Sequence, residues 1–149
     1  MDAITAILSL TQRYFSDVEQ VMSNLKLGDG LFGLGNDPKK HPCHMAYYEA
    51  MAKILSQAES QALSKETLDR IVTLVLRLDA DHREQSEMVG LMLQAVQGLT
   101  LPLIPRLSQG CAQELAAWYE REYPRKSRMP NQSKVLRALK RQTASALRV

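Results

Sequence analysis

The sequence predicts an all-α, single-domain helical bundle (residues 1–149) of five or six helices with one long glycine-rich loop over residues 28–41. Aromatic residues make up 5% of the chain, while Leu, Ala and Met are plentiful, and this balance favours helix over sheet. Apolar residues recur at spacings of three and four in several segments, which is the helical period. A chain of 149 residues with 45% hydrophobic content is long enough for one sizeable core.

The first helix is predicted from Asp2 to about Leu27, with the Asp2 side chain accepting from the first turn. Its apolar residues follow a heptad seam with a second apolar line beside it, which is typical of a helix that contacts two neighbours. The seam residues are Ile4, Leu8, Thr11, Phe15, Val18, Met22 and Leu25.

The stretch "GDGLFGLGNDPKKHPCH", residues 28–44, contains the predicted loop and starts at Gly28, at the position for a left-handed helix cap. Its first six residues match the dinucleotide spelling GxGxxG, but a predicted helix rather than a strand precedes them, so nucleotide binding is not expected. Long connections in compact bundles are often functional. The candidate interaction residues of this loop are Leu31, Phe32, Leu34, Asn36 and Asp37.

The second and third helices follow. Pro42 suits the first turn of a helix that runs to about Ala62, and its expected inward face is Met45, Tyr48, Ala52 and Leu55. Ser64 is a good cap for a third helix. Its apolar residues lie almost all round, so we expect it to be the most buried one, with an inner face of Leu68, Ile71, Val72, Val75 and Leu78.

Two interpretations of the secondary structure remain open for residues 64–97. In the preferred one, a polar turn follows Asp79, and Asp81 and Glu84, at capping-box spacing, start a new helix from His82 to Gln97. In the other, one helix runs from Ser64 to Gln97, because no Gly or Pro intervenes before Gly90. The stretch "GLTLPLIPRL" then predicts a break, with Pro102 and Pro105 at the start of a helix that runs to Glu122. We expect Ile104, Leu107, Cys111, Leu115 and Trp118 to share one face of this helix.

The C-terminal part differs in charge from the rest of the chain. Residues 120–149 hold nine Lys/Arg against two Asp/Glu, whereas residues 1–119 are net acidic. Residues 121–149 are expected to form a basic linker and a final helix from about Gln132, with Val135, Leu136, Leu139 and Ala146 on its apolar side. This part could be a separable docking segment, a solvated face or a nucleic-acid surface. The candidate basic residues are Arg125, Lys126, Arg128, Lys134, Arg137, Lys140 and Arg141.

The stretch "HPCH" gathers His41, Cys43 and His44 at a predicted helix start. Free helical N–H groups favour a thiolate, so these residues could form a reactive cysteine or part of a zinc site with His82 or Asp79. In the favoured structural interpretation, a histidine caps the helix and Cys43 packs as a small apolar residue.

Arg77 and His82, in "RLDADH", have the spacing R-x4-H. This spacing resembles the catalytic pair of HEPN-type ribonucleases, which are also small helical bundles. The resemblance implies that Arg77 stabilises a phosphate and that His82 acts in acid–base transfer on RNA across a dimer. The alternative is a solvated turn whose charges serve as caps and surface pairs.

The remaining features favour a protein without catalytic chemistry. We expect a cytoplasmic chain, because no apolar run is long enough to span a membrane and two cysteines make no disulfide framework. No firm catalytic or metal constellation, cofactor or small-molecule substrate is predicted. The preferred hypothesis is a non-enzymatic interaction, assembly or regulatory protein that self-associates. The alternative is a nucleic-acid binder that uses the basic C-terminal segment, or a ribonuclease of the HEPN type.

Overall fold

The computed structural model describes residues 2–24 and 37–147 and confirms the all-α helical bundle. This part of the chain contains six α-helices, joined by short 3-10 helices, and no strand. The α-helices are α1 (Ala3–Asn24), α2 (Pro42–Ser60), α3 (Lys65–Asp81), α4 (Glu87–Val96), α5 (Gln109–Glu122) and α6 (Pro130–Leu147). The 3-10 helices are η2 (Pro38–Lys40), η3 (Gln97–Thr100), η4 (Ile104–Arg106) and η5 (Arg125–Ser127).

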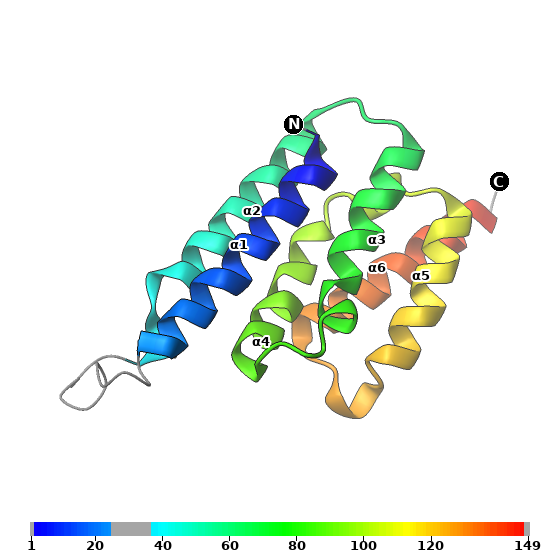
Figure 1. The fold of residues 1–149 in the computed structure, drawn as a ribbon. Coiled ribbons are helices and arrows are strands. Elements are labelled where there is room, and N and C mark those ends of the chain that lie inside the picture. The colour runs from blue at the N-terminus through cyan, green and yellow to red at the C-terminus, as the bar shows by residue number, and fades with distance from the viewer. Residues whose placement is uncertain (1, 25–36, 148–149) are drawn as a thin grey trace.

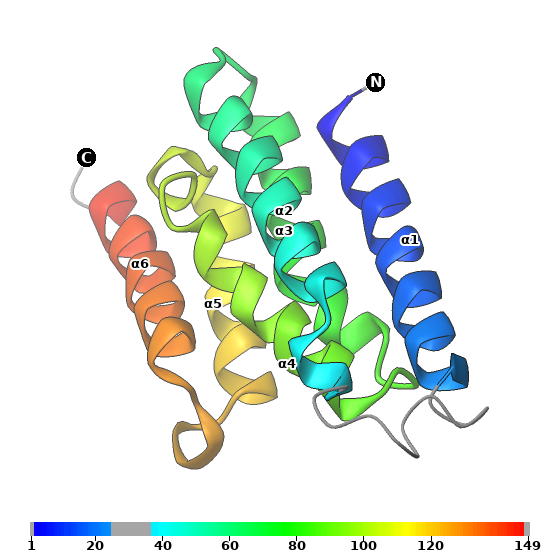
Figure 2. The same cartoon turned by 90° about the vertical axis from the view of Figure 1, so that its left-hand side faces the viewer.

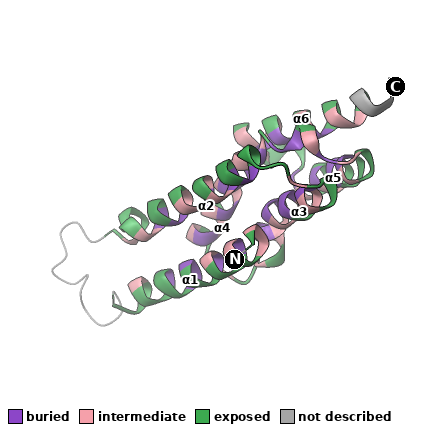
Figure 3. Ribbon diagram, turned by 90° about the horizontal axis from the view of Figure 1, so that it is seen from above, coloured by how far each residue is buried: buried purple, intermediate pink, exposed green. Residues whose placement is uncertain are grey.

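The helices form two antiparallel pairs on either side of a central pair. Helix α1 packs on α2 and α5 packs on α6, while α3 and α4 lie between them (Figures 1 and 2). Helix α3 contacts α1, α4 and α5, which explains why its predicted inner face is buried throughout. Seen from above, exposed residues line the outer sides of α1 and α2 (Figure 3). None of the described helices is long and apolar enough to cross a membrane.

Polar side chains mark where four of the helices begin. In each case a side-chain oxygen accepts a hydrogen bond from the backbone N–H three residues later, which satisfies one of the free donors of the first turn. The four caps are Asp2 for α1, Ser64 for α3, Ser86 for α4 and Ser108 for α5. The cap at Asp2 and the cap at Ser64 were predicted from the sequence.

The cap at Ser86 decides between the two readings of residues 64–97. Two helices are present, but α4 begins at Glu87 rather than at His82. The predicted capping box at Asp81 and Glu84 was wrong, because Asp81 belongs to the end of α3 and His82 follows it as the C-terminal cap.

The predicted inward face of α2 was displaced by one residue. Met45 is 55% exposed, and the buried residues of α2 are His44, Tyr47, Met51, Leu55 and Ala58. The ring of Tyr47 stacks on that of Tyr14 in α1, with the ring centroids 4.3 Å apart and the planes 4° from parallel. This contact sets the rotation of α2 about its axis, so that Leu55 alone of the four predicted residues is buried.

The prolines of "GLTLPLIPRL" do not open a long helix. Pro105 lies in η4, and α5 begins only at Gln109, because Ser108 supplies the cap. Ile104 and Leu107 therefore lie before the start of α5, and both are buried. The last helix begins at Pro130, two residues earlier than predicted, and it buries Val135, Leu136 and Leu139 as expected.

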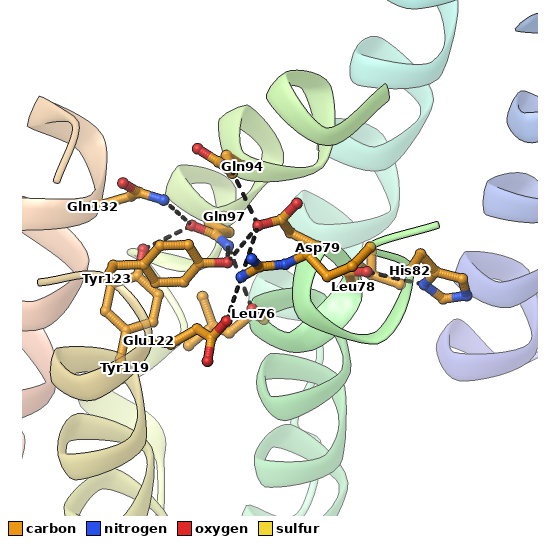
Figure 4. A network of polar contacts seen from close by, with 11 residues as sticks. Leu76, Leu78, Asp79, His82, Gln94, Gln97, Tyr119, Glu122, Tyr123 and Gln132 are labelled. Carbon is orange, nitrogen blue, oxygen red and sulfur yellow. Dashed lines mark hydrogen bonds and ion pairs between the residues drawn. The ribbon is translucent and has the colours of Figure 1, made fainter. Parts of the chain in front are cut away.

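Gln97, which is fully buried, uses the whole hydrogen-bonding capacity of its side chain. Its Nε2 donates to the Tyr123 hydroxyl at 3.0 Å and to the Leu76 carbonyl at 3.4 Å. Its Oε1 accepts from the Tyr119 hydroxyl at 2.7 Å and from Gln132 Nε2 at 3.2 Å. One amide at the start of η3 thus connects α3, α5 and α6 (Figure 4).

Asp79 extends this network toward the surface. Its Oδ2 accepts from the Tyr123 hydroxyl at 2.8 Å and from Gln94 Nε2 at 3.2 Å, and it lies 3.6 Å from Arg83 Nη2. Arg83 also pairs with Glu122 of α5. Every buried side-chain nitrogen and oxygen in the described ranges has a partner, so this polar core is satisfied, as a stable interior requires.

Replacing Gln97 by Leu is expected to lower the free energy of unfolding by about 2–4 kcal/mol, because several buried partners would lose their bonds at once. Urea denaturation followed by circular dichroism measures this change. The matched control is Gln113→Leu on the exposed side of α5, which should change stability by less than about 0.5 kcal/mol. Equal losses in the two variants would contradict a special role for Gln97.

The buried tyrosines predict a loss of stability in alkali. Burial raises the pKa of Tyr47 from 10.0 to about 12, although its hydrogen bond with Thr11 opposes the shift. Between these values the folded chain keeps a proton that the unfolded chain releases, so stability falls as the pH rises above 10. The loss is up to about 1.4 kcal/mol per pH unit for each such group. Denaturation between pH 9 and 11 should therefore show a shallower decline in Tyr47→Phe than in the parent, and an unchanged slope would refute this.

Candidate interaction surface

Helix α4 is apolar on two sides. Val89, Leu93 and Val96 point into the core and are buried. A second side, about 120° around the helix axis, carries Met88, Leu91, Met92 and Ala95, at the spacing of three and four residues that forms one helical face. Leu91 is 48% exposed, and the other three are partly exposed. We call these four residues the outer face of α4.

The outer face of α4 forms one wall of a groove of about 340 Å³. Lys39 of η2 and His44 of α2 line the opposite wall, and Glu87 lies at the start of α4. The groove is thus apolar along α4 and carries one positive and one negative side chain. Such a hollow suits an apolar group flanked by charges.

Contacts on the buried side hold α4 in place. Gln94 Nε2 donates to Asp79 of α3, and the Gln94 carbonyl accepts from Asn131 Nδ2 of α6 at 2.9 Å. Gly90 lies beside Asp79, where an added Cβ would be 3.4 Å from Oδ1, an ordinary van der Waals distance. These bonds hold α4 so that Leu91 is left exposed, while Met88 and Met92 are partly buried against the core.

His44, which lines the groove, has both ring nitrogens engaged. Its Nε2 lies 2.8 Å from the Pro38 carbonyl, and its Nδ1 lies 2.7 Å from the Tyr14 hydroxyl. A carbonyl only accepts, so Nε2 carries a proton and donates to Pro38, and with a single ring proton Nδ1 accepts from Tyr14. His44 is 7% exposed and joins η2 and α2 to α1.

The other two residues of "HPCH" also have local roles. His41 Nδ1 accepts from the Cys43 N–H at 3.1 Å and caps α2. Burial, together with the nearby Asp17 carboxylate, raises the pKa of the Cys43 thiol, which opposes formation of a thiolate. Within residues 2–24 and 37–144, no three His, Cys, Asp or Glu side chains are placed to hold a metal ion.

Arg77 and His82 lie against different neighbours. The Arg77 guanidinium is 4.9 Å from the ring centre of Trp118 in α5 and 3.7 Å from Asp81. His82 Nδ1 is 2.9 Å from the Leu78 carbonyl, and its ring is 5.0 Å from that of Phe15 in α1. The structure therefore directs the two side chains toward helices on either side of α3, and no hydrogen bond among the described residues joins them.

The candidate basic residues comprise five exposed cations, one lysine in an ion pair and one partly buried arginine. Arg125 and Lys126 are exposed in η5, and Lys134, Arg137 and Arg141 are exposed on α6. Lys140 pairs with Glu120 at 3.0 Å. Arg128 is partly buried, and its Nε donates to the Tyr123 carbonyl at 3.0 Å, where it caps α5.

The candidate interaction loop lies mostly outside the described residues. Leu31, Phe32, Leu34 and Asn36 belong to the range 25–36, and only Asp37 is described. Asp37 Oδ1 accepts from Lys39 N at 3.0 Å and caps η2. Residues 38–40 therefore form a helical turn rather than the irregular loop predicted for them.

No family model, curated protein or solved structure matches this chain. The groove along α4 was not predicted from the sequence, although a signal for it was present. The segment "EMVGLMLQAV" has apolar residues on every side, which for a helix of ten residues means either complete burial or an exposed apolar face.

Zinc should leave the melting temperature unchanged, because the nitrogens of His44 and the Nδ1 of His41 already have hydrogen-bond partners. A metal at 100 times its dissociation constant would add about 2.7 kcal/mol of stability, which thermal denaturation detects easily. A saturable rise in melting temperature that disappears in both His41→Ala and Cys43→Ala would contradict this expectation.

Proposed function

We propose that this protein is a non-enzymatic interaction and assembly module that binds through the outer face of α4. The observation that carries the proposal is the pattern of α4, a short helix that buries one apolar side in the core and carries a second apolar side that is partly exposed, most of all at Leu91. Fully burying a large apolar side chain contributes about 1.5–3 kcal/mol of free energy. A partner that covers the exposed part of Leu91 therefore gains binding free energy.

The composition of this face supports a binding role. Two of its four residues are methionines, whose unbranched side chains adapt to the shape of a partner. The groove beside it provides concave surface, and interface hot spots favour such pockets. Lys39 and Glu87 give the groove charges of both signs, which can fix the orientation of a partner.

We propose a second copy of the chain as the first partner to test. The spacing of Met88, Leu91, Met92 and Ala95 is that of a short helical seam, and two such seams related by a two-fold axis present the same patch to each other. A two-fold arrangement also allows each Lys39 to meet the Glu87 of the other copy. The seam predicted on α1 is less suited, because Thr11, Phe15 and Val18 are buried inside the monomer.

Leu91→Glu is expected to weaken self-association, because a carboxylate would have to be desolvated at the centre of the contact. Sedimentation equilibrium of the parent should show a mass that rises with concentration above that of the monomer. The variant should associate at least tenfold more weakly, which corresponds to about 1.4 kcal/mol.

The matched control is Leu8→Glu, which places the same charge at an exposed leucine of α1 (44% exposed). This variant should associate like the parent. A parent that stays monomeric at the highest attainable concentration would contradict self-association. Dissociation caused by Leu8→Glu but not by Leu91→Glu would move the interface to α1.

A further inference from the structure

The solvent-facing side of α6 is almost purely cationic. Between residues 130 and 144 the exposed residues are Pro130, Lys134, Arg137, Lys140, Arg141 and Ala144. Lys134, Arg137 and Arg141 fall within about 60° of one another around the helix axis, at 3.6 residues per turn. The buried residues Gln132, Val135 and Leu139 lie on the other side, so the three cations project straight away from the core.

These charges are not neutralised by their own segment. From Tyr123 to Val149 the sequence contains eight Lys or Arg and no Asp or Glu. Among the described residues, Lys140 is the one residue of α6 that forms an ion pair, and its partner is Glu120. Lys134, Arg137 and Arg141 therefore keep their charge available at the surface.

The short helix η5 adds two more cations at the N-terminal end of α6. Arg125 and Lys126 are exposed there, and η5 lies at the end of the α5–α6 pair where α6 begins (Figure 2). We call Arg125, Lys126, Lys134, Arg137 and Arg141 the cationic strip. Along α6, the step from Lys134 to Arg141 covers about 10 Å, so the strip is an extended feature rather than a point charge.

We propose that the cationic strip binds the phosphate backbone of a nucleic-acid duplex without reading its sequence. Phosphate is the ligand that a row of unpaired cations complements best, and such contacts supply sequence-independent affinity. This activity is separate from the interaction proposed for α4, which uses a different helix.

Other polyanions fit the strip less well. A membrane-surface helix inserts an apolar side into lipid, but the apolar side of α6 is buried in the core. Protein interfaces are depleted in Lys at their centres, and no large apolar side chain is exposed among the cations of α6 between residues 130 and 144. Single strands are bound largely by stacking on aromatic rings, and every aromatic residue in the described ranges is buried or half-buried.

The salt dependence of binding gives a quantitative expectation. If the five cations each neutralise one phosphate, the logarithm of the association constant falls against that of the salt concentration with a slope of about −4 to −5. Fluorescence anisotropy with short labelled duplexes of RNA and of DNA, between about 50 and 200 mM salt, measures this slope. Both duplexes should bind, because neither base edges nor sugar hydroxyls are needed.

The test variant is K134E/R137E/R141E, which should lose more than tenfold in affinity at low salt. The control variant is R13E/K53E/K65E, which changes net charge equally at exposed cations on α1, α2 and α3 and should stay within about threefold of the parent, since distant charges are screened. If the glutamates destabilise the fold, K134Q/R137Q/R141Q removes the same charges without adding repulsion and should flatten the slope to about −2.

Several results would overturn the proposal. Failure of the parent to bind duplex at low salt is one, and a loss of affinity in the control variant as large as in the test variant is another. Binding of single strands, of vesicles with anionic lipid or of polyglutamate as tightly as duplex would assign the strip to another class of ligand. Leu91→Glu should leave duplex binding unchanged, so failure of the proposal for α4 and failure of this one are distinguishable.

Discussion

The side-chain amide of Gln97 is the interaction on which the arrangement of the bundle depends. A buried amide is costly unless all of its donors and acceptors are paired, and here the four bonds come from three segments: Leu76 of α3, Tyr119 and Tyr123 around the end of α5, and Gln132 of α6. Apolar packing alone tolerates small rotations of helices, whereas this set of directional bonds does not. The network therefore fixes how the C-terminal pair of helices meets α3, and through Gln94 and Asp79 it also fixes α4.

That constraint explains why α4 can expose apolar residues without disturbing the fold. Its inner side is anchored by packing and by bonds to α3 and α6, so Leu91 at the outer face can stay 48% exposed, while Met88 and Met92 beside it also pack against the core. Helix α6 is divided in a similar way, because Gln132, Val135 and Leu139 are buried in the core and its cations are exposed. In both helices, one side holds the fold together and the other is available for partners.

The sequence predicted the fold class and most helix positions, because apolar periodicity and capping residues are local signals. The start of α4 was misplaced since two polar residues, Asp81 and Ser86, could each cap a helix, and tertiary contacts of α3 decide between them. The inward face of α2 was also missed, because the Tyr14–Tyr47 stack that fixes its rotation joins residues far apart in the sequence. The local roles of His41 and Cys43 at the helix start were foreseeable, whereas the partner of His44, Tyr14, was not. The Gln97 network could not be foreseen for the same reason, since its members are separated by 21 to 35 residues.

The bonds of His44 restrict how the groove beside α4 can change. The same imidazole lines the groove beside α4 and bonds Tyr14 of α1 and the carbonyl of Pro38. A change of residue 44 that reshapes the groove for a new partner would also remove bonds that join the first two helices. The groove can therefore diversify through Met88, Leu91 and Met92, which make no such bonds, while position 44 should tolerate little variation over evolutionary time.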